Sequence, residues 1–578
     1  MDDALMDTQT ARPYAATGYV IGVDAGGTYT DAVIVDVATG SAVAWAKSPT
    51  THHQPSISVA ASVGAVLKKA QINPADVHTT AVSTTLATNA LLEDKGVDVG
   101  LFVIGFNQRM EVPAAAARFV PGGHKQDGSE AEPLGIEYLI DHLKDLHGKV
   151  DAYAVCSMHG YVNPAHELVA AKAIQLTSKL PVFCSHEASM QAGMRERATT
   201  AVLNARLLPV MEQFLAGVRT ALADLGLKGS VYVVRGDATT MTMEEAARKA
   251  ASTVASGPAA TACFGAEYAS TTCCDFSGQK QPDVLVVDVG GTTTDMTIVR
   301  NGNPVIDTGG MIIGEWQTHV DAVEMFTVAV GGDSLVALDP AGGMSIGPTR
   351  VVPVCMVAGM GMELPDPAGW AGTGLGSRCV CAGQALTDEA CQGDKLLALL
   401  NERRVMPLKE LLAELNMPEV TYNARMLRLA REQKIFECGF TPTDALHVLE
   451  AMKMGCTESA LRMARRLSAL RGEDAVTFSR NVVEKVEARI EDAILQHVAR
   501  REVGGNLAGF LARRNNFSLL DIKVRLAVPV VGIGAASQYL VPGVASRLGT
   551  RAVFPRLHEV GNAVGAAMLA LKGLQQAD

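Results

Sequence analysis

Two copies of one short motif constrain the fold of this chain more than any other feature. The first copy, Asp-Ala-Gly-Gly-Thr-Tyr-Thr-Asp, occupies residues 24–31, and the second, Asp-Val-Gly-Gly-Thr-Thr-Thr-Asp, occupies residues 288–295. Four apolar runs flank the two copies, at 19–23, 32–35, 284–287 and 296–299. An apolar strand, a glycine turn and a second strand predict a β-hairpin whose tip is mostly backbone.

The composition of each tip favours contact with phosphate. Paired glycines let the backbone approach a ligand, threonine adds a hydroxyl, and a nest of N–H groups binds phosphate oxygens. The predicted nucleotide contacts at the tips are Gly26, Gly27, Thr28, Thr30, Gly290, Gly291, Thr292 and Thr294. The leading carboxylates, Asp24 and Asp288, are the predicted catalytic ligands of a hydrated Mg2+ ion, and Asp31 and Asp295 are expected to support the turns.

A single tip of this kind is more often an ordinary tight turn. Two near-identical copies at domain-scale spacing instead predict two related domains that hold one phosphate chain. The motif is not a Walker loop, because Gly-Lys-Ser/Thr is absent and a strand follows the turn. It is not a dinucleotide fingerprint, which would require a helix at that point.

A third segment completes a nucleotide-binding pattern. Residues 524–531 form a buried-strand pattern that runs into Gly532, Gly534, Ala535 and Ser537, where a helix begins. Residues 558–567 are a helix of small residues, although either segment alone is equally well explained by core packing. In this order the segments resemble the actin, sugar kinase and heat-shock chaperone superfamily, in which the hairpins hold phosphates and the third element holds adenosine. The resemblance implies ATP as the nucleotide and an α/β fold of two actin-like (ribonuclease H-like) domains with a helical insertion.

Composition excludes several other classes. The chain has 578 residues, a net charge of −11 and eleven cysteines, which indicates more than one domain, no nucleic-acid partner and reduced thiols in the cytoplasm. We expect no membrane segment, because proline and glycine interrupt the uncharged stretch 526–546. The domain prediction is a flexible tail at 1–17, a first domain at 18–270, a second domain at 283–578 and a helical insertion at 394–480.

Polar residues follow several predicted strands of the first domain. His159 and Glu187 are the catalytic candidates there, and His186 and Arg197 are further candidates on the substrate side. Ligands gather outside the carboxyl ends of strands in open α/β sheets, although each of these residues could equally be a satisfied polar group. Cys355, Cys379, Cys381 and Cys391 do not have standard zinc spacing, so whether they bind a metal stays open, as do the roles of His52 and His53.

A closer resemblance covers most of residues 18–300. The chain is similar to the alpha-type subunit of the ATP-dependent hydantoinase/oxoprolinase family, which includes N-methylhydantoinase, 5-oxoprolinase, caprolactamase and acetone carboxylase. The matching segments are 24–31, 83–93, 159–167, 185–187, 196–204, 244–248, 256–260 and 288–295. After residue 300 the chain departs from the family pattern, because the long glycine-rich stretch is reduced to 327–334 and the proline-glycine-cysteine segment is replaced by 351–384.

The family resemblance implies a function and leaves two alternatives. The leading expectation is a subunit that phosphorylates a cyclic amide for ring opening, together with a beta-type subunit that completes the reaction. The first alternative is a subunit of an ATP-dependent ketone carboxylase, and the second is an ATPase activator or reactivating factor. The convergent polar groups between residues 83 and 187 argue against a pure switch, whereas the sequence does not separate the two enzymes.

Overall fold

The computed structural model describes residues 18–27, 29–51, 54–92, 96–272, 283–504, 509–511 and 522–577. The predicted tail, Thr28, His52 and His53 lie outside the described residues. Two compact units make up the chain, and neither is continuous in sequence. The first unit comprises 1–267, 302–324 and 560–578, and the second comprises 268–301 and 325–559.

The first unit is built on a six-stranded sheet with the order β10-β9-β4-β1-β2-β3. Its strands are β1 (Tyr19–Ala25), β2 (Tyr29–Asp36), β3 (Ala42–Pro49), β4 (Val77–Thr84), β9 (Ser230–Val234) and β10 (Thr240–Thr242). The first three strands are antiparallel, and β4 and β9 join β1 in parallel. The register pairs Asp24 with Asp31 across the predicted first hairpin.

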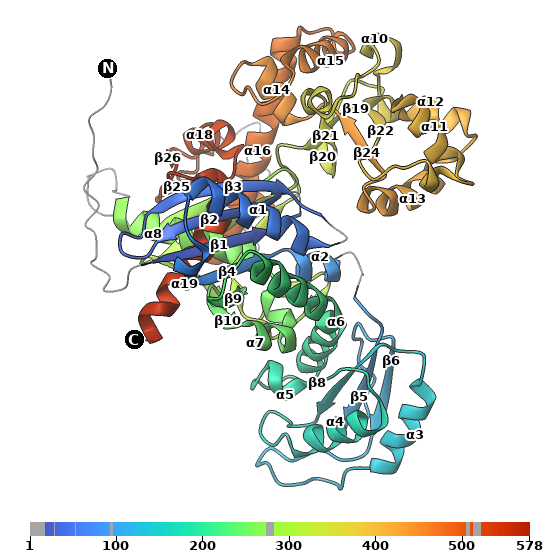
Figure 1. Cartoon of the computed structure of the whole chain (residues 1–578), viewed down its shortest axis with the longest axis vertical. Coiled ribbons are helices and arrows are strands. Elements are labelled where there is room, and N and C mark those ends of the chain that lie inside the picture. The colour runs from blue at the N-terminus through green and yellow to red at the C-terminus, as the bar shows by residue number, and fades with distance from the viewer. Residues whose placement is uncertain are drawn as a thin grey trace. The chain divides into compact units, whose positions relative to one another are not determined.

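Helices cover both faces of this sheet. One face packs its Ile and Val side chains against α1 (Pro55–Ala70) and α6 (Met194–Asp224) in a shared core (Figure 1). The other face packs against α19 (Gly561–Ala577). This helix approaches β1 so closely that Ala563 and Ala567 leave no room for a side chain at Gly22. A helix of small residues permits such backbone contact.

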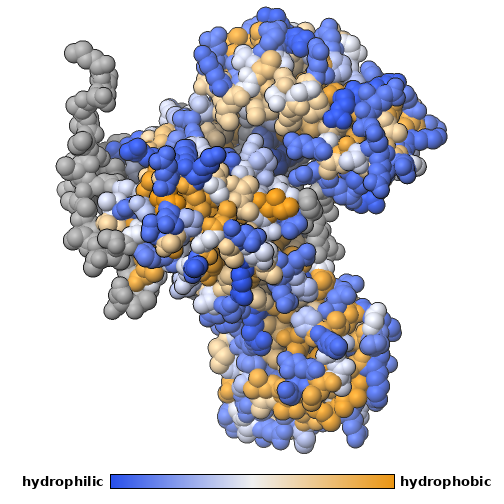
Figure 2. Space-filling model, in the orientation of Figure 1, coloured by the Kyte–Doolittle hydropathy of each residue, from blue (hydrophilic) through white to orange (hydrophobic). Residues whose placement is uncertain are grey.

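A smaller parallel sheet, β6-β5-β7-β8, belongs to the same unit. Its strands are β5 (Val99–Ile104), β6 (Ala116–Val120), β7 (Ala152–Ser157) and β8 (Val182–Cys184). Side chains of α3 (Ile136–Leu146) and α4 (Ala165–Thr177) fill the core on one face, and those of α6 fill the core on the other. Figure 1 shows these helices beside the sheet. Figure 2 shows apolar surface scattered over this part among polar residues. Leu168 of α4 is one of its exposed apolar side chains.

The second unit repeats the central arrangement of the first sheet. Five strands of its six-stranded sheet are β11 (Val284–Val289), β12 (Thr294–Arg300), β18 (Met325–Val328), β25 (Val530–Ile533) and β26 (Ala552–Val553). In the order β18-β12-β11-β25-β26, two antiparallel pairings are followed by two parallel pairings, as in β3-β2-β1-β4-β9. This repeat confirms the predicted fold class of two actin-like, ribonuclease H-like domains.

The boundaries of the units differ from the predicted continuous domains. Residues 302–324 and α19 pack with the first unit, although both come after the second hairpin in sequence. Val323 N–H donates to the Gly236 carbonyl at 2.7 Å, and His319 N–H donates to Thr200 Oγ1 at 2.9 Å. Hydrophobic periodicity does not reveal such long-range contacts, which is why the sequence predicted one uninterrupted second domain.

The predicted helical insertion at 394–480 also contains strands. Its helices are α11 (Lys395–Arg403), α12 (Leu408–Glu414), α13 (Glu419–Arg431), α14 (Pro442–Val448) and α15 (Thr457–Ala469), followed by the start of α16 (Ala475–Glu502). Strands β23 (Val405–Pro407) and β24 (Ile435–Gly439) join β21 (Val352–Pro353) and β22 (Arg378–Ala382) in a four-stranded sheet. The insertion is therefore mixed, because short apolar runs do not distinguish a strand from a buried helix.

None of the described helices is both long and apolar enough to cross a lipid bilayer.

Candidate functional site

The first hairpin has a tip closed by backbone and a buried carboxylate at its base. Gly26 N–H donates to the Tyr29 carbonyl at 3.2 Å. Asp24 accepts from Ser83 Oγ at 2.7 Å on one oxygen and from Asn562 Nδ2 at 3.2 Å on the other. Burial raises the pKa of Asp24, and these two hydrogen bonds oppose the rise. Both oxygens already have a protein partner, so a bound ion is better reached through water than directly.

The second hairpin repeats this geometry and exposes its tip. Gly290 N–H donates to the Thr293 carbonyl at 3.0 Å. Gly290 and Thr292 are exposed, and among the described residues no acceptor lies within hydrogen-bond distance of the N–H groups of Gly291 and Thr292. Successive unpaired N–H groups at an exposed tip are a ready anion-binding site.

The predicted threonines and carboxylates behind the tips support the turns. Thr30 and Thr294 are fully buried. The hydroxyl of Thr30 donates to Ser58 Oγ at 2.9 Å, and that of Thr294 donates to the Val330 carbonyl at 2.7 Å. Asp295 accepts from Thr327 Oγ1 at 2.6 Å, and burial raises its pKa. Both threonine hydroxyls point into the protein, which favours a supporting role over the predicted direct contact.

Asp31 titrates near neutral pH. Burial raises the pKa of this carboxyl to about 7, although Lys47 Nζ lies 3.3 Å from it and opposes the rise. The folded state therefore favours the protonated carboxyl, because the ordinary value is 3.8. The contribution of Asp31 to stability is fully present below about pH 4 and is lost as the pH rises through about 7.

We therefore expect Asp31→Asn to stabilise the protein at alkaline pH. The free energy of unfolding at pH 8 should rise by about 1–3 kcal/mol, and the difference from the wild type should vanish near pH 4. Urea denaturation at both pH values measures this. A variant that is equally destabilised at both pH values would show that the ion pair with Lys47 outweighs the cost of burying the charge.

The third predicted segment lies against the second hairpin. Gly534 follows β25 with φ = +89°, and a side chain there would collide with the Val289 carbonyl and Asp288 Oδ1. Ser537 is buried at the start of α18 (Ser537–Arg547), and its hydroxyl donates to the Gly534 carbonyl at 2.7 Å. Ala535 is half-buried, and Gly532 makes room for the ring of Phe554. The structure thus places the Gly534 turn against the end of β11, where the second hairpin begins its turn.

A buried ion network joins the strand-end residues of the smaller sheet. Glu167 Oε1 accepts from Ser157 N–H at 2.8 Å, Ser185 Oγ at 2.6 Å and Arg197 Nη2 at 2.9 Å. Glu167 Oε2 accepts from His186 N–H at 2.9 Å and from His186 Nδ1 at 2.7 Å. Burial alone would raise the pKa of Glu167, but the hydrogen bond from His186 and the charge of Arg197 hold it below its ordinary value.

This network defines the state of His186. Because a carboxylate only accepts, Nδ1 of His186 carries the proton, and the neutral ring has its lone pair on Nε2. No partner of Nε2 lies among the described residues, and 16% of the side chain is exposed. Glu167 is the last residue of the matching segment 159–167, but the sequence did not identify it as a site residue, because its partners are distant in sequence.

The two predicted catalytic residues of this region have different surroundings. His159 adopts φ = +53° after β7, and its buried Nδ1 has no partner among the described residues. Glu187 accepts from Cys184 N–H at 3.3 Å, and it forms an ion pair with Arg248. The carboxylate of Glu187 is therefore engaged in capping and ion pairing, whereas Glu167 occupies the centre of the network.

The four cysteines whose metal binding the sequence left open do not form a metal-compatible group among the described residues. Cys379 and Cys381 on β22 lie buried beside Cys438 of β24, with 3.5 Å between the sulfurs of Cys381 and Cys438. Cys391 lies elsewhere, donating to the Thr387 carbonyl. Within the described ranges, only one group of three histidine, cysteine or acidic side chains could hold a metal ion, and it consists of Glu167, Cys184 and His186. Burial raises the pKa of Cys184 and Glu167 is saturated with donors, so this set does not fit a metal either.

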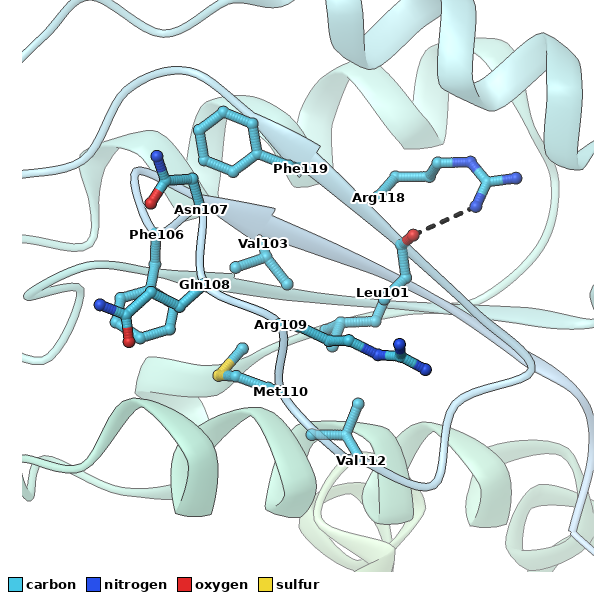
Figure 3. Close-up of a pocket in the computed structure, with 11 residues that line it drawn as sticks. Leu101, Val103, Phe106, Asn107, Gln108, Arg109, Met110, Val112, Arg118 and Phe119 are labelled. Atoms are coloured by element: carbon cyan, nitrogen blue, oxygen red, sulfur yellow. Dashed lines mark hydrogen bonds between the residues drawn. The ribbon is translucent and has the colours of Figure 1, made fainter.

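A separate hollow of about 350 Å³ opens beside the strand pair β5–β6. Figure 3 shows the chain from Phe106 to Val112 curving around it, with Leu101 and Val103 on β5 and Phe119 on β6. Arg118 donates to the Ala117 carbonyl at 3.1 Å at its rim. None of the predicted site residues lines this hollow, so it is distinct from both the tips and the Glu167 network.

Comparison with known proteins decides the family. Residues 20–177 match the family described as hydantoinase/oxoprolinase N-terminal region, and residues 197–361 match hydantoinase/oxoprolinase. The chain belongs to the hydantoinase/oxoprolinase family. It is 27% identical to caprolactamase subunit alpha of Pseudomonas jessenii over 364 residues, 57% of this chain and 50% of that protein. It is 25% identical to the acetophenone carboxylase gamma subunit of Aromatoleum aromaticum over 57% of this chain and 49% of that protein.

Solved structures share the fold with this family member. Nucleotide-free acetone carboxylase has a TM-score of 0.64 at 18% identity, with 96% of this chain and 70% of that chain covered. The ATP-dependent caprolactamase of Pseudomonas jessenii has a TM-score of 0.60 at 20% identity, with 95% and 70% covered. The chain spans about half the length of the curated relatives it matches.

Proposed function

We propose that this protein is an ATP-dependent subunit that activates a cyclic amide for ring opening. The substrate class is a hydantoin, 5-oxoproline or a lactam. The observation that carries the proposal is the repeated tip, in which Gly26 and Gly290 close equivalent turns and carboxylates occupy equivalent register positions, Asp24 opposite Asp31 and Asp288 opposite Asp295. A cytoplasmic location is part of the proposal and rests on composition alone.

The residues present fit a magnesium nucleotide. The N–H groups of Gly291 and Thr292 lack acceptors among the described residues, as phosphate oxygens would require. Asp24 and Asp288 are the groups we assign to the hydrated ion, and the Gly534–Ser537 turn is the one we assign to adenosine. Bound ATP would supply a phosphoryl group that converts an amide oxygen into a leaving group, and such transfer needs mainly positioning and charge neutralisation.

The Glu167 network is the proposed substrate side. Amides resist attack because resonance gives the C–N bond partial double-bond character. Glu167 fixes the orientation of His186, whose Nε2 can then accept a proton from water or from the amide. Arg197 is fully buried, donating to both Glu167 and the Ser157 carbonyl, and it holds these groups at the end of β7. His159 is the neighbouring candidate for contact with substrate.

A second subunit is the proposed partner. The printed names of two relatives call them the alpha subunit of a caprolactamase and the gamma subunit of a carboxylase. Ring opening needs attack by water as well as activation. The Gly-x-Ser-x-Gly sequence at 343–347 lies in strand β20 and not at a strand-to-helix turn, so it is not a nucleophile elbow. We assign the completion of the reaction to a beta-type subunit.

We expect the purified chain to bind Mg-ATP and to hydrolyse it slowly, without opening any ring. Incubation with ATP and hydantoin, 5-oxoproline or caprolactam should give product only after a beta-type subunit is added, as measured by chromatography of the ring-opened acid. The matched control is the same mixture with His186→Ala, which should lose product formation while retaining ATP binding. Efficient ring opening by the chain alone would refute the division of labour.

Ketone carboxylation is the second candidate, favoured by the match to the acetophenone carboxylase gamma subunit. Acetone or acetophenone with bicarbonate and ATP, assayed under the same conditions, separates the two activities. Carboxylate formation without ring opening of any amide would replace the leading proposal by this one.

A further inference from the structure

The loop before β19 (Ser334–Leu338) lies against the second tip. Gly332 N–H donates to the Gly290 carbonyl at 3.0 Å, and Asp333 N–H donates to the Gly291 carbonyl at 2.7 Å. These bonds occupy the carbonyl oxygens of the tip. The loop therefore fixes the orientation of the two peptide groups whose neighbouring N–H groups remain without acceptors.

The side chain of Asp333 contacts the tip directly. A methyl group added at Gly291 would lie 2.5 Å from Asp333 Oδ2, so a side chain at this position would displace the carboxylate. Burial raises the pKa of Asp333, and Arg350 opposes the rise. A buried carboxylate beside a predicted phosphate site would repel phosphate unless a cation accompanies it.

Arg350 supplies that cation. It ends β20 (Met344–Arg350), directly opposite Ser334 in the sheet register, and its Nε and Nη2 lie 3.4 Å and 3.3 Å from Asp333 Oδ2. These distances are long for charge-assisted hydrogen bonds. The guanidinium has five N–H donors, and no other acceptor for it lies in the part of the chain that the structure describes. The side chain is 35% exposed, so its remaining donors are accessible.

We infer that Arg350 binds the terminal phosphates of the nucleotide beside the N–H groups of Gly291 and Thr292, and that Asp333 positions its guanidinium. This inference rests on the proposed function and deepens it by naming a further phosphate ligand. Arginine suits this role because its planar fork can pair with two phosphate oxygens.

The test is calorimetric titration of the full chain with Mg-ATP and with AMP, which lacks the terminal phosphates. Arg350→Ala should weaken Mg-ATP binding by about 10- to 100-fold, the usual range for charged hydrogen bonds, and leave AMP binding unchanged. Arg350→Lys should recover part of the loss. Asp333→Asn should weaken Mg-ATP binding less than Arg350→Ala does. Arg403→Ala, which breaks an exposed ion pair with Glu414 on α12, is the matched control and should bind as the wild type.

Four results would overturn the inference. Wild-type affinity for Mg-ATP in Arg350→Ala would remove Arg350 from the site while leaving the proposed function intact. Equal losses for Mg-ATP and AMP would assign Arg350 a structural role. Tighter Mg-ATP binding by Asp333→Asn would show that the carboxylate obstructs the tip. If the wild type binds no Mg-ATP at all, the proposed function fails, and this inference fails with it.

Discussion

Replacing Asp24 or Asp288 by asparagine should lower ATP turnover by at least about 100-fold, the usual effect of removing one preorganised charged group from a transition state. Asparagine keeps the size of the side chain but removes the charge that we assign to the hydrated metal ion. The fold should survive in Asp24→Asn, because a neutral amide costs less to bury than a carboxylate. Burial already raises the pKa of Asp24, which reflects that cost. Phosphate release in the presence of Mg-ATP measures the effect.

The control for this pair is Asp339→Asn. Asp339 is an exposed turn aspartate of the second unit that accepts from Ala341 and Gly343 N–H, so its replacement should leave turnover unchanged. Thermal unfolding of all three variants separates loss of activity from loss of structure. Normal turnover in both hairpin variants would contradict the assignment of the tips to phosphate and metal.

Replacing Glu167 by alanine should destabilise the smaller sheet by about 3–5 kcal/mol, the usual result of leaving a buried charge without its partner. Arg197 is 1% exposed and would lose its carboxylate. His186 would lose the acceptor that fixes its ring, so ring opening should also be lost. Urea denaturation followed by hydrogen exchange at β7 and β8 would locate the loss.

Two variants define the meaning of that result. Glu167→Gln keeps an acceptor of the same size without the charge, so it should be less destabilising than alanine. Glu244→Ala breaks the exposed pair with Arg219, and surface pairs contribute at most about 1 kcal/mol, so its effect should be small. A loss for Glu167→Ala as small as that for Glu244→Ala would mean that the network does not stabilise the sheet.

Local sequence was sufficient to predict the two hairpins. Each tip is formed by residues that are adjacent in the chain. The apolar run on either side of it predicts the two strands and therefore the position of the tip between them. The same is true of the Gly532–Ser537 turn, whose strand and helix are contiguous. The repeated pattern then predicted the fold class, because two copies of one hairpin imply two copies of the sheet that carries it.

Contacts between distant segments were beyond the reach of the sequence. Glu167 meets Ser185 and Arg197 only after β7, β8 and α6 have packed, and nothing in the spacing of these residues identifies the carboxylate at the centre. The same holds for Asp333 beside Gly291. The inward direction of the Thr30 and Thr294 hydroxyls was not predicted for a related reason, since alternation along a strand tells which residues share a face but not which face meets the ligand.

The position of α19 bears on the order in which the protein can mature on the ribosome. The hydrogen bond from Asn562 to Asp24 joins residues 538 apart in sequence, and Ala563 and Ala567 complete the surface under Gly22 of β1. Synthesis proceeds from the N-terminus, so the first sheet emerges early but keeps one face uncovered until α19 (Gly561–Ala577) has been made. Nascent chains of this protein therefore expose an apolar surface until α19 emerges, and they are expected to require chaperone protection that a chain with sequential domains would not.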